Sequence, residues 1–349
     1  MKRYLLPPDT QYKTNLHCHS TRSDGSLSPA RLKELYRAHG YSAVAFTDHD
    51  GLFYHDELTD AEFIALAGFE IDFGEDRPDA LDWTQNKTCH LCAIVKDPIA
   101  ASQNGFGPAP SDRPSVLWSQ DEKNRKLIFR DDTVLFAKDY APEPVSEAIK
   151  VLNERGFLVH YNHPRWSLEE YPDYIGYKGL HGVELYNHGC FLEGYDEYNG
   201  DVYDALLRSG QRLIALATDD NHRDISHPQH DMFGGFTMIA AKELSYRGLI
   251  DALEKGDCYA STGPLIRELS CEMLAEDHGR VYLAVEGAVD YIRMTADIRA
   301  AALRYNANGE KITEATFDFN PHYVKYLRFE VGDGIRRAYT RAYFTPSLS

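Results

Sequence analysis

Two hydrophobic patterns divide the chain near residue 264. Up to that point, nearly continuous apolar runs such as residues 42–47 alternate with apolar residues spaced three and four apart, as at Leu32, Leu35 and Tyr36. Runs of the first kind are typical of strands that are buried on both faces, and the second spacing is typical of amphipathic helices. Their alternation predicts an α/β domain over residues 1–264, built from strand–helix–strand units.

Capping residues and glycines mark the ends of the predicted helices. Ser28 followed by proline is a strong helix start, and Gly40 ends the apolar stripe that follows it. A second stripe over residues 142–155 ends at Gly156, and Ser245 begins a third helix. Strands are expected at residues 13–19, 42–47, 62–73, 88–95, 157–161, 182–186, 212–217 and 236–241.

From residue 265 onward, apolar residues recur at every second position. Leu283 and Val285 follow this rule, and the Gly-Asp-Gly sequence at 332–334 is a hairpin turn signal. We therefore expect a small all-β, sandwich-like module over residues 265–349. Residues 97–141 have little periodicity and several glycines and prolines, which predicts an insertion within the first domain.

The excess of acidic over basic residues limits which classes of partner the chain is expected to bind. The 349 residues include 37 Lys and Arg against 54 Asp and Glu, a formal net charge of −17. This charge argues against a nucleic-acid groove or an anionic membrane surface as partner, but metal ions would still let a small phosphorylated substrate bind.

The chain shows no targeting or membrane segment in its pattern. The first apolar run ends at Pro7, which is too short for a signal peptide, and no run nears the ~20 residues of a membrane span. Six cysteines in so long a chain are expected to be buried and reduced. We expect a cytoplasmic protein with no membrane partner, and the pattern predicts no particular oligomeric state.

Residues that bind metal ions follow the predicted strands. His17 and His19 are two apart in the first strand, so both imidazoles would lie on one face. The candidate metal ligands are His17, His19, Asp24, His49, Glu70, His90, His163, Asp220 and His222. Six imidazoles and three carboxylates exceed the three or four ligands of one zinc ion, so we expect two or three divalent ions of zinc, manganese or iron.

This donor set predicts a metal-dependent hydrolase. A metal cluster lowers the pKa of bound water, neutralises phosphate oxygens and stabilises the leaving oxygen, as hydrolysis of a phosphate ester requires. The sequence Gly-x-Ser-x-Gly is absent, and no cysteine has a clearly dedicated histidine base. We assign the catalytic roles to Glu70, Asp220 and His222 and expect a small phosphorylated substrate.

The ordered motifs resemble those of the PHP family, named for its polymerase and histidinol-phosphatase members. They are His-Cys-His at 17–19 with Asp24, Thr-Asp-His-Asp at 47–50, Glu70, His90, His-Pro at 163–164 and Asp-Asn-His at 220–222. The resemblance covers about residues 14–264, and the β structure that follows resembles a subgroup of PHP phosphoesterases. It implies a distorted (β/α)7 TIM-like barrel. Our own expectation for the reaction is hydrolysis of a nucleotide or sugar phosphate by a metal-bridged hydroxide.

The same resemblance implies a trinuclear site at the C-terminal ends of the strands. His17, His19, Glu70 and Asp220 would hold the first metal ion. The second would lie between Glu70, His90 and His163, and the third between Asp24, His49 and His222. Asp219 is an alternative to Asp220, which we prefer because Asp-x-His places both ligands on one face.

Three arginines beside the motifs are candidates for binding a substrate phosphate. Arg22, Arg165 and Arg223 each follow or lie within a ligand motif. A guanidinium group binds phosphate through two parallel hydrogen bonds, although salt bridges within this acidic protein are the alternative role.

Further alternatives concern one strand end and the class of function. Glu184, Asn187 and His188 end a predicted strand, where they either reach the site or form structural hydrogen bonds. Other functions for the same residues are hydrolysis of an amide or carboxylic ester bond, or a non-catalytic role in which the β module binds a partner. The charge of −17 argues against a nuclease.

Overall fold

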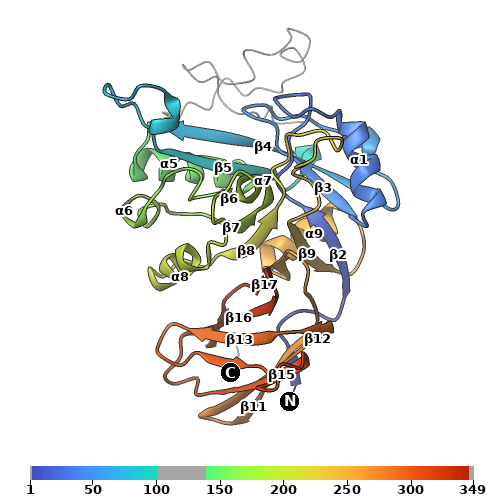
Figure 1. Cartoon of the computed structure of the whole chain (residues 1–349), viewed down its shortest axis with the longest axis vertical. Coiled ribbons are helices and arrows are strands. Elements are labelled where there is room, and N and C mark those ends of the chain that lie inside the picture. The colour runs from blue at the N-terminus through green and yellow to red at the C-terminus, as the bar shows by residue number, and fades with distance from the viewer. Residues whose placement is uncertain (1, 101–138, 346–349) are drawn as a thin grey trace.

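The computed structural model describes residues 2–100 and 139–345, and Figure 1 shows their arrangement. Within these residues the strands form one mixed sheet of 14 strands and a second sheet of four. Most of the predicted insertion at 97–141 lies outside the described residues. No helix in the described part of the chain is long and apolar enough to cross a membrane.

Strands and helices alternate through most of the first 264 residues, as the hydrophobic pattern predicts. The strands are β2 (Thr10–Asn15), β3 (Ala43–Phe46), β4 (Ile64–Gly74), β5 (Thr88–Val95), β6 (Phe157–Tyr161), β7 (Gly182–Asn187), β8 (Ile214–Thr218), β9 (Phe236–Ala241) and β10 (Cys258–Ser261). The helices are α1 (Pro29–Ala38), α5 (Pro142–Glu154), α6 (Tyr171–Tyr174), α7 (His188–Leu192), α8 (Gly200–Arg208) and α9 (Tyr246–Lys255).

The predicted helix ends are confirmed by their caps. The Ser28 side chain accepts a hydrogen bond from the backbone of Arg31, and Ser245 caps α9 in the same way. Gly256 ends α9 in the left-handed conformation, with φ of 73°, which favours glycine. The buried stripe of α5 consists of Val145, Ala148, Ile149 and Leu152.

The large sheet contains two parallel groups of strands joined by an antiparallel one. Strands β2, β3 and β4 are parallel to one another, as are β6, β7 and β8. Strand β5 lies between the groups and runs antiparallel to both β4 and β6. The reversed direction of β5 brings its beginning, rather than its end, to the side of the sheet where the candidate ligands lie.

The sheet is open, and its strand pairing does not form the closed (β/α)7 barrel that the resemblance implied. Strand β8 ends the hydrogen-bonded order beyond β7. Strands β8 and β9 are joined by a side chain rather than by backbone hydrogen bonds. The Thr237 hydroxyl accepts from Ala217 N at 3.2 Å and donates to Ala217 O at 3.1 Å. Past the strand, one isolated parallel bridge joins Cys18 to Asn221. No ladder continues here because both edges of β9 are already paired, one with β2 and the other with β10.

The first predicted strand ends earlier than its apolar pattern suggested. It stops at Asn15, so His17 and His19 lie in the segment that follows β2 rather than within it. The Asn15 side-chain carbonyl accepts from the backbone N–H groups of His17 (3.4 Å) and Asp219 (3.0 Å). These bonds hold the segment after β2 beside the segment after β8.

The C-terminal residues form a sandwich-like arrangement in which the amino terminus takes part. One sheet has the order β1 (Lys2–Tyr4), β11 (Leu265–Ala275), β12 (His278–Val289) and β15 (Ile312–Phe319). The large sheet continues with β13 (Tyr291–Ala296), β14 (Ala302–Arg304), β16 (Tyr326–Asp333), β17 (Arg336–Thr340) and β18 (Tyr343–Phe344). Between the sheets, the rings of Phe317 and Phe329 lie 5.7 Å apart. Because β17 pairs with β10, hydrogen bonding is continuous across residue 264, and the division into domains there stays a prediction.

A buried carboxyl group anchors the segment that follows β6. The side chain of Glu169 accepts hydrogen bonds from the hydroxyls of Tyr161 (2.5 Å), Tyr140 (3.0 Å) and Tyr177. Its backbone N–H donates to Pro164 O at 3.1 Å. Burial raises the pKa of Glu169 to about 7, although the three hydroxyls oppose this rise.

Replacing Glu169 with glutamine should remove part of the pH dependence of folding stability. The folded chain keeps the Glu169 proton up to about pH 7, whereas an unfolded chain releases it near pH ~4.3. This group's stabilising contribution is therefore complete below pH ~4.3 and is lost as the pH rises through 7. Urea unfolding at pH 5 and pH 8 should show a smaller fall in the free energy of unfolding for Glu169→Gln than for the wild type. Equal falls in the wild type and in Glu169→Gln would contradict this prediction. The control is Glu147→Gln, which changes an exposed side chain of α5.

Candidate metal centre

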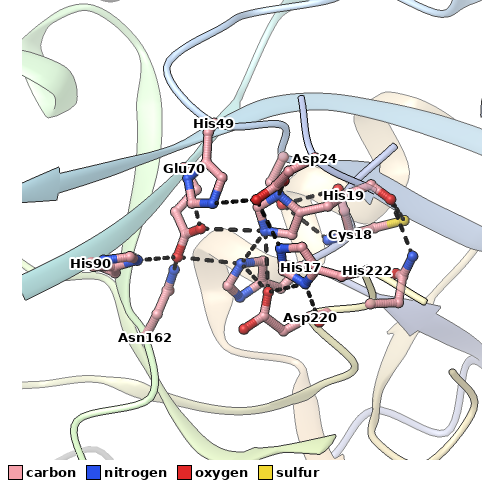
Figure 2. Close-up of polar contacts among 12 residues, drawn as sticks. His17, Cys18, His19, Asp24, His49, Glu70, His90, Asn162, Asp220 and His222 are labelled. Atoms are coloured by element: carbon pink, nitrogen blue, oxygen red, sulfur yellow. Dashed lines mark hydrogen bonds and ion pairs between the residues drawn. The ribbon is translucent and has the colours of Figure 1, made fainter. Parts of the chain in front are cut away.

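The nine predicted ligands meet in one place, although they come from distant parts of the sequence. Figure 2 labels eight of them, all except His163, and their side chains point toward one another. Their nitrogen and oxygen atoms form three groups, and within each group the atoms lie within 4.8 Å of one another. The groups are His17, His19, Glu70 and Asp220; Glu70, His90 and His163; and His19, Asp24, His49 and His222. His19 in the third group is the only addition to the predicted sets.

The first group has the spacing of a tetrahedral metal site. His17 Nε2 and His19 Nε2 are 3.1 Å apart, and each lies 3.1 Å from Asp220 Oδ1. Glu70 Oε1 lies 3.3 Å from His17 Nε2, and Glu70 Oε2 lies 3.3 Å from His19 Nε2. Ligands at 2.0–2.1 Å from a zinc ion are ~3.3 Å apart along the edges of a tetrahedron. All four side chains are buried.

Glu70 connects the groups because its two oxygens face different histidines. Oε1 lies 3.1 Å from His90 Nδ1 and 3.2 Å from His163 Nε2. Oε2 lies 3.3 Å from His49 Nδ1, and the amide of Asn162 donates to Oε1 at 2.7 Å. Such a carboxylate has the position of a bridge between two metal ions.

The third group is the more exposed one. Asp24 Oδ2 lies 3.4 Å from His222 Nε2 and 3.5 Å from His49 Nε2, and Asp24 Oδ1 lies 3.4 Å from His19 Nδ1. The side chain of His222 is 35% exposed, whereas that of His19 is fully buried. This group therefore lies between the buried ligands and solvent.

The charges and donors of the site fit a divalent cation. Burial opposes ionisation of Glu70, but His17, His90 and His49 hold its pKa well below its ordinary value. Burial disfavours a charged His17, yet Asp220 and the other acidic groups around it raise the pKa of His17 well above the ordinary value. Asp220 Oδ1 is buried and accepts no well-oriented hydrogen bond within the described residues. Positive charge at this position is favourable, and imidazole with carboxylate is a donor set for zinc, manganese or iron.

The structure distinguishes the roles of the two adjacent aspartates, Asp219 and Asp220, either of which could be the metal ligand from the sequence. Asp220, with φ of 53°, points into the first group. Asp219 points away and accepts from the backbone N–H groups of Phe233 (2.8 Å), Gly234 (2.9 Å) and Gly235 (2.8 Å). Tyr36 also donates to it, at 2.9 Å. Asp220 is therefore the residue placed to bind metal, and Asp219 fixes the chain around it.

Asp48, which precedes His49, has a similar structural role. It accepts from the backbone N–H groups of Ser20 at 2.8 Å and Ser23 at 3.1 Å. These bonds shape the turn that carries Asp24.

The site opens into a cavity of about 760 Å³. Seven of the nine predicted ligands line it, while His17 and His19 do not. Trp166 forms part of the wall, held by hydrogen bonds from its backbone N–H to Glu197 (2.7 Å) and from Nε1 to Glu193 (3.0 Å). The Trp166 ring lies 5.0 Å from that of His163 and 6.4 Å from that of Trp83. Neither tryptophan was predicted from the sequence, because neither belongs to a periodic pattern. The one indication in the sequence was that Trp166 lies three residues after His163.

The three candidate arginines lie in different surroundings. Arg223 lines the cavity, where it donates to Gln229 O at 3.0 Å and has a looser ion pair with Glu193 at 3.7 Å. Arg165 is not among the lining residues and pairs with Asp201 at 2.9 Å, the salt-bridge alternative. Arg22 lies 5.8 Å from the centre of the Phe53 ring and is likewise not among the lining residues. The structure therefore places only Arg223 of the three beside the site.

Comparisons with known proteins give short or weak likenesses. No protein-family model matches the chain. A stretch of 38 residues, 11% of the chain, is 53% identical to a 5′-3′ exoribonuclease of Haemophilus influenzae and spans 14% of that protein's length.

Among solved structures, similarity extends over much of the chain at 17% sequence identity. A two-domain protein from Bacteroides vulgatus, described as containing a predicted PHP-like metal-dependent phosphoesterase, covers 93% of this chain and 92% of its own with a TM-score of 0.44. A suspected metal-dependent phosphoesterase from Bifidobacterium adolescentis covers 63% and 92%, with a TM-score of 0.38. An amidohydrolase from Chromobacterium violaceum, solved with sulfate and no metal, covers 62% and 90%, with a TM-score of 0.37. The family named for the Bacteroides protein is the one that the His, Asp and Glu motifs of this chain resemble.

Proposed function

We propose that this chain is a metal-dependent phosphoesterase of the PHP type that hydrolyses a small phosphorylated substrate. The observation that supports it best is the meeting of nine histidine, aspartate and glutamate side chains in three overlapping groups. The first group would hold one divalent ion, Glu70 with His90 and His163 a second, and Asp24 with His49 and His222 a third. Such ions supply Lewis acidity and activate water for attack on a phosphate ester.

The chain's own residues prepare the site for that chemistry. Glu70 links the first two groups, because its Oε1 faces His17 of the first group and His163 of the second. Asp220 presents one buried oxygen between His17 and His19. His222 lies at the cavity wall, where the substrate enters, and Arg223 offers a guanidinium group for the phosphate.

The cavity favours a small substrate with a ring. A volume of about 760 Å³ lies within the range of small-molecule sites. Trp83 and Trp166 offer aromatic faces for a nucleobase or the apolar face of a sugar. The name of the matched Haemophilus protein adds nucleotides to this expectation, while the charge of −17 disfavours long nucleic acids.

The proposal is tested by turnover with controlled metal content. The purified protein is stripped with a chelator, reloaded with Mn²⁺, Zn²⁺ or Fe²⁺, and assayed on nucleotide and sugar phosphates, phosphodiesters, short RNA, carboxylic esters and amides. We expect phosphate release that depends on the metal. Activity on the amides or esters alone would support the other hydrolase class, and no turnover at full metal occupancy would contradict the proposal.

Arg223 and Arg165 provide a matched pair for phosphate binding. Arg223→Ala should raise KM for the phosphorylated substrate about tenfold, equivalent to ~1.4 kcal/mol of lost binding, because Arg223 lines the cavity. Arg165→Ala should change KM less than twofold, because Arg165 is engaged by Asp201. Steady-state kinetics on both variants measures the difference. Equal effects would show that Arg223 does not contact the phosphate.

A further inference from the structure

One strand that supplies no candidate ligand lies between two groups of ligands. Strand β7 pairs with β6, which leads to His163, and with β8, which leads to Asp220. None of its residues belongs to the three groups. At the middle of β7, however, Glu184 is fully buried beside them.

The carboxylate of Glu184 touches three of the segments that carry ligands. Oε1 accepts from His17 Nδ1 at 2.8 Å and from the Thr218 hydroxyl at 2.7 Å. Oε2 accepts from the backbone N–H of His163 at 3.0 Å and from the Asn187 amide at 3.0 Å. Four donors therefore fix its two oxygens in one orientation.

The contact with His17 decides which nitrogen faces the metal group. A buried carboxylate beside Nδ1 favours the tautomer with its proton on Nδ1. Nε2 then carries the lone pair, and Nε2 is the atom 3.1 Å from Asp220 and 3.3 Å from Glu70. A carboxylate on the far nitrogen also makes an imidazole a more basic ligand.

Asn187 fixes the orientation of the Asp220 carboxylate in a similar way. Its amide nitrogen donates to Glu184 Oε2 and to Asp220 Oδ2, at 3.0 and 3.1 Å. Its carbonyl accepts from the backbone N–H of Cys190 at 3.0 Å, which caps α7 and fixes the amide orientation. With Oδ2 engaged, Asp220 presents Oδ1 alone to His17 and His19.

We infer that Glu184 and Asn187 are positioning residues that set the tautomer of His17 and the orientation of Asp220, and so determine the affinity of the first metal group. This inference rests on the proposed function, since it assumes that the group binds a divalent ion. Strand β7 would then contribute to the site although none of its residues belongs to the three metal-binding groups. Glu184 contacts His17 after β2, His163 after β6 and Thr218 at the end of β8.

The test measures zinc affinity and tautomer state in the full chain, without substrate. Metal-free protein is titrated with Zn²⁺ in competition with a chromophoric chelator. Glu184→Gln should weaken the tightest site about 10- to 100-fold, the usual effect of removing a carboxylate behind a metal-binding histidine. Glu330→Gln, which changes a buried glutamate of β16 outside the three groups, should change zinc affinity less than twofold.

A second measurement separates positioning from general stability. ¹H–¹⁵N spectra of the imidazoles in the zinc-loaded proteins, with the His17 signal assigned by its absence in His17→Gln, should show the Nδ1–H form in the wild type and a changed tautomer population in Glu184→Gln. An unchanged tautomer with unchanged zinc affinity would overturn the inference, even if the variant unfolds more easily. If the wild type itself binds no zinc, the proposed function fails as well, so the two failures are distinguishable.

Asn187→Asp is the second variant should Glu184→Gln not fold. It keeps the oxygen that accepts from Cys190 but replaces the amide donor with an oxygen that faces two carboxylates. Zinc affinity should again fall about 10- to 100-fold. Unchanged affinity in Asn187→Asp would overturn the inference.

Discussion

Glu70→Gln should lower kcat/KM on the best phosphoester substrate by about 1000-fold or more, or ~4 kcal/mol of transition-state stabilisation. Glu70 is the one carboxylate whose oxygens belong to two of the three groups. Glutamine keeps the shape but removes the negative charge and leaves only one acceptor oxygen. Two metal positions would be weakened by a single substitution.

Metal content and kinetics on the same sample measure this effect. Elemental analysis of Glu70→Gln after equilibration with Mn²⁺ or Zn²⁺ should show fewer bound ions per chain than the wild type. Glu75→Gln is the control, because Glu75 lines the same cavity but lies outside the three groups. Wild-type activity in Glu70→Gln, or equal losses in the two variants, would show that Glu70 is not a shared ligand.

The adjacent pair Asp219 and Asp220 should separate folding stability from activity. Asp220→Asn should lose about 100-fold or more in kcat/KM, the scale of losing a site-orienting or metal-binding group, while the chain still folds. Asp219→Asn should lower the free energy of unfolding by ~3 kcal/mol, because a buried network loses its acceptor. Both Asp219 oxygens accept backbone N–H groups, so either orientation of an asparagine side chain sets its NH₂ against a donor.

Chemical denaturation and kinetics on both variants give the four numbers required. The activity of Asp219→Asn is compared per folded molecule, below its unfolding transition. If Asp220→Asn is the destabilised variant and Asp219→Asn the inactive one, the assignment of their roles must be exchanged.

The convergence of the site was predictable because its motifs end consecutive strands. His17, His49, Glu70 and Asp220 come at or just after apolar runs, and strand ends meet at one side of a sheet. Ranking Asp220 above Asp219 was also possible, although the reason was incomplete. The spacing argument assumed extended backbone, whereas Asp220 adopts a positive φ that turns it inward.

The errors arose where direction or pairing depends on distant residues. Arg165 lies two residues after His163, but its guanidinium group meets Asp201, 36 residues further on. The sheet stays open beyond β8 because β9 pairs on its two edges with β2 and with β10, which is far along the chain from β2. Hydrophobic patterns predict that strands are buried, but not which neighbour they pair with. The role of Glu184, which the sequence left open between two alternatives, also depends on partners from separate segments.

The reversed direction of β5 offers a place for protein engineering. Val95, at the end of β5, pairs with Phe157 at the start of β6, and both lie beyond the Glu70–Cys92 pair on the side away from His90. The chain thus leaves β5 and returns to β6 on the side of the sheet opposite the cavity. A fluorescent reporter or affinity label attached at exposed Glu154, just before β6, would accordingly be remote from the ligand atoms, leaving the cavity free for assays on immobilised protein.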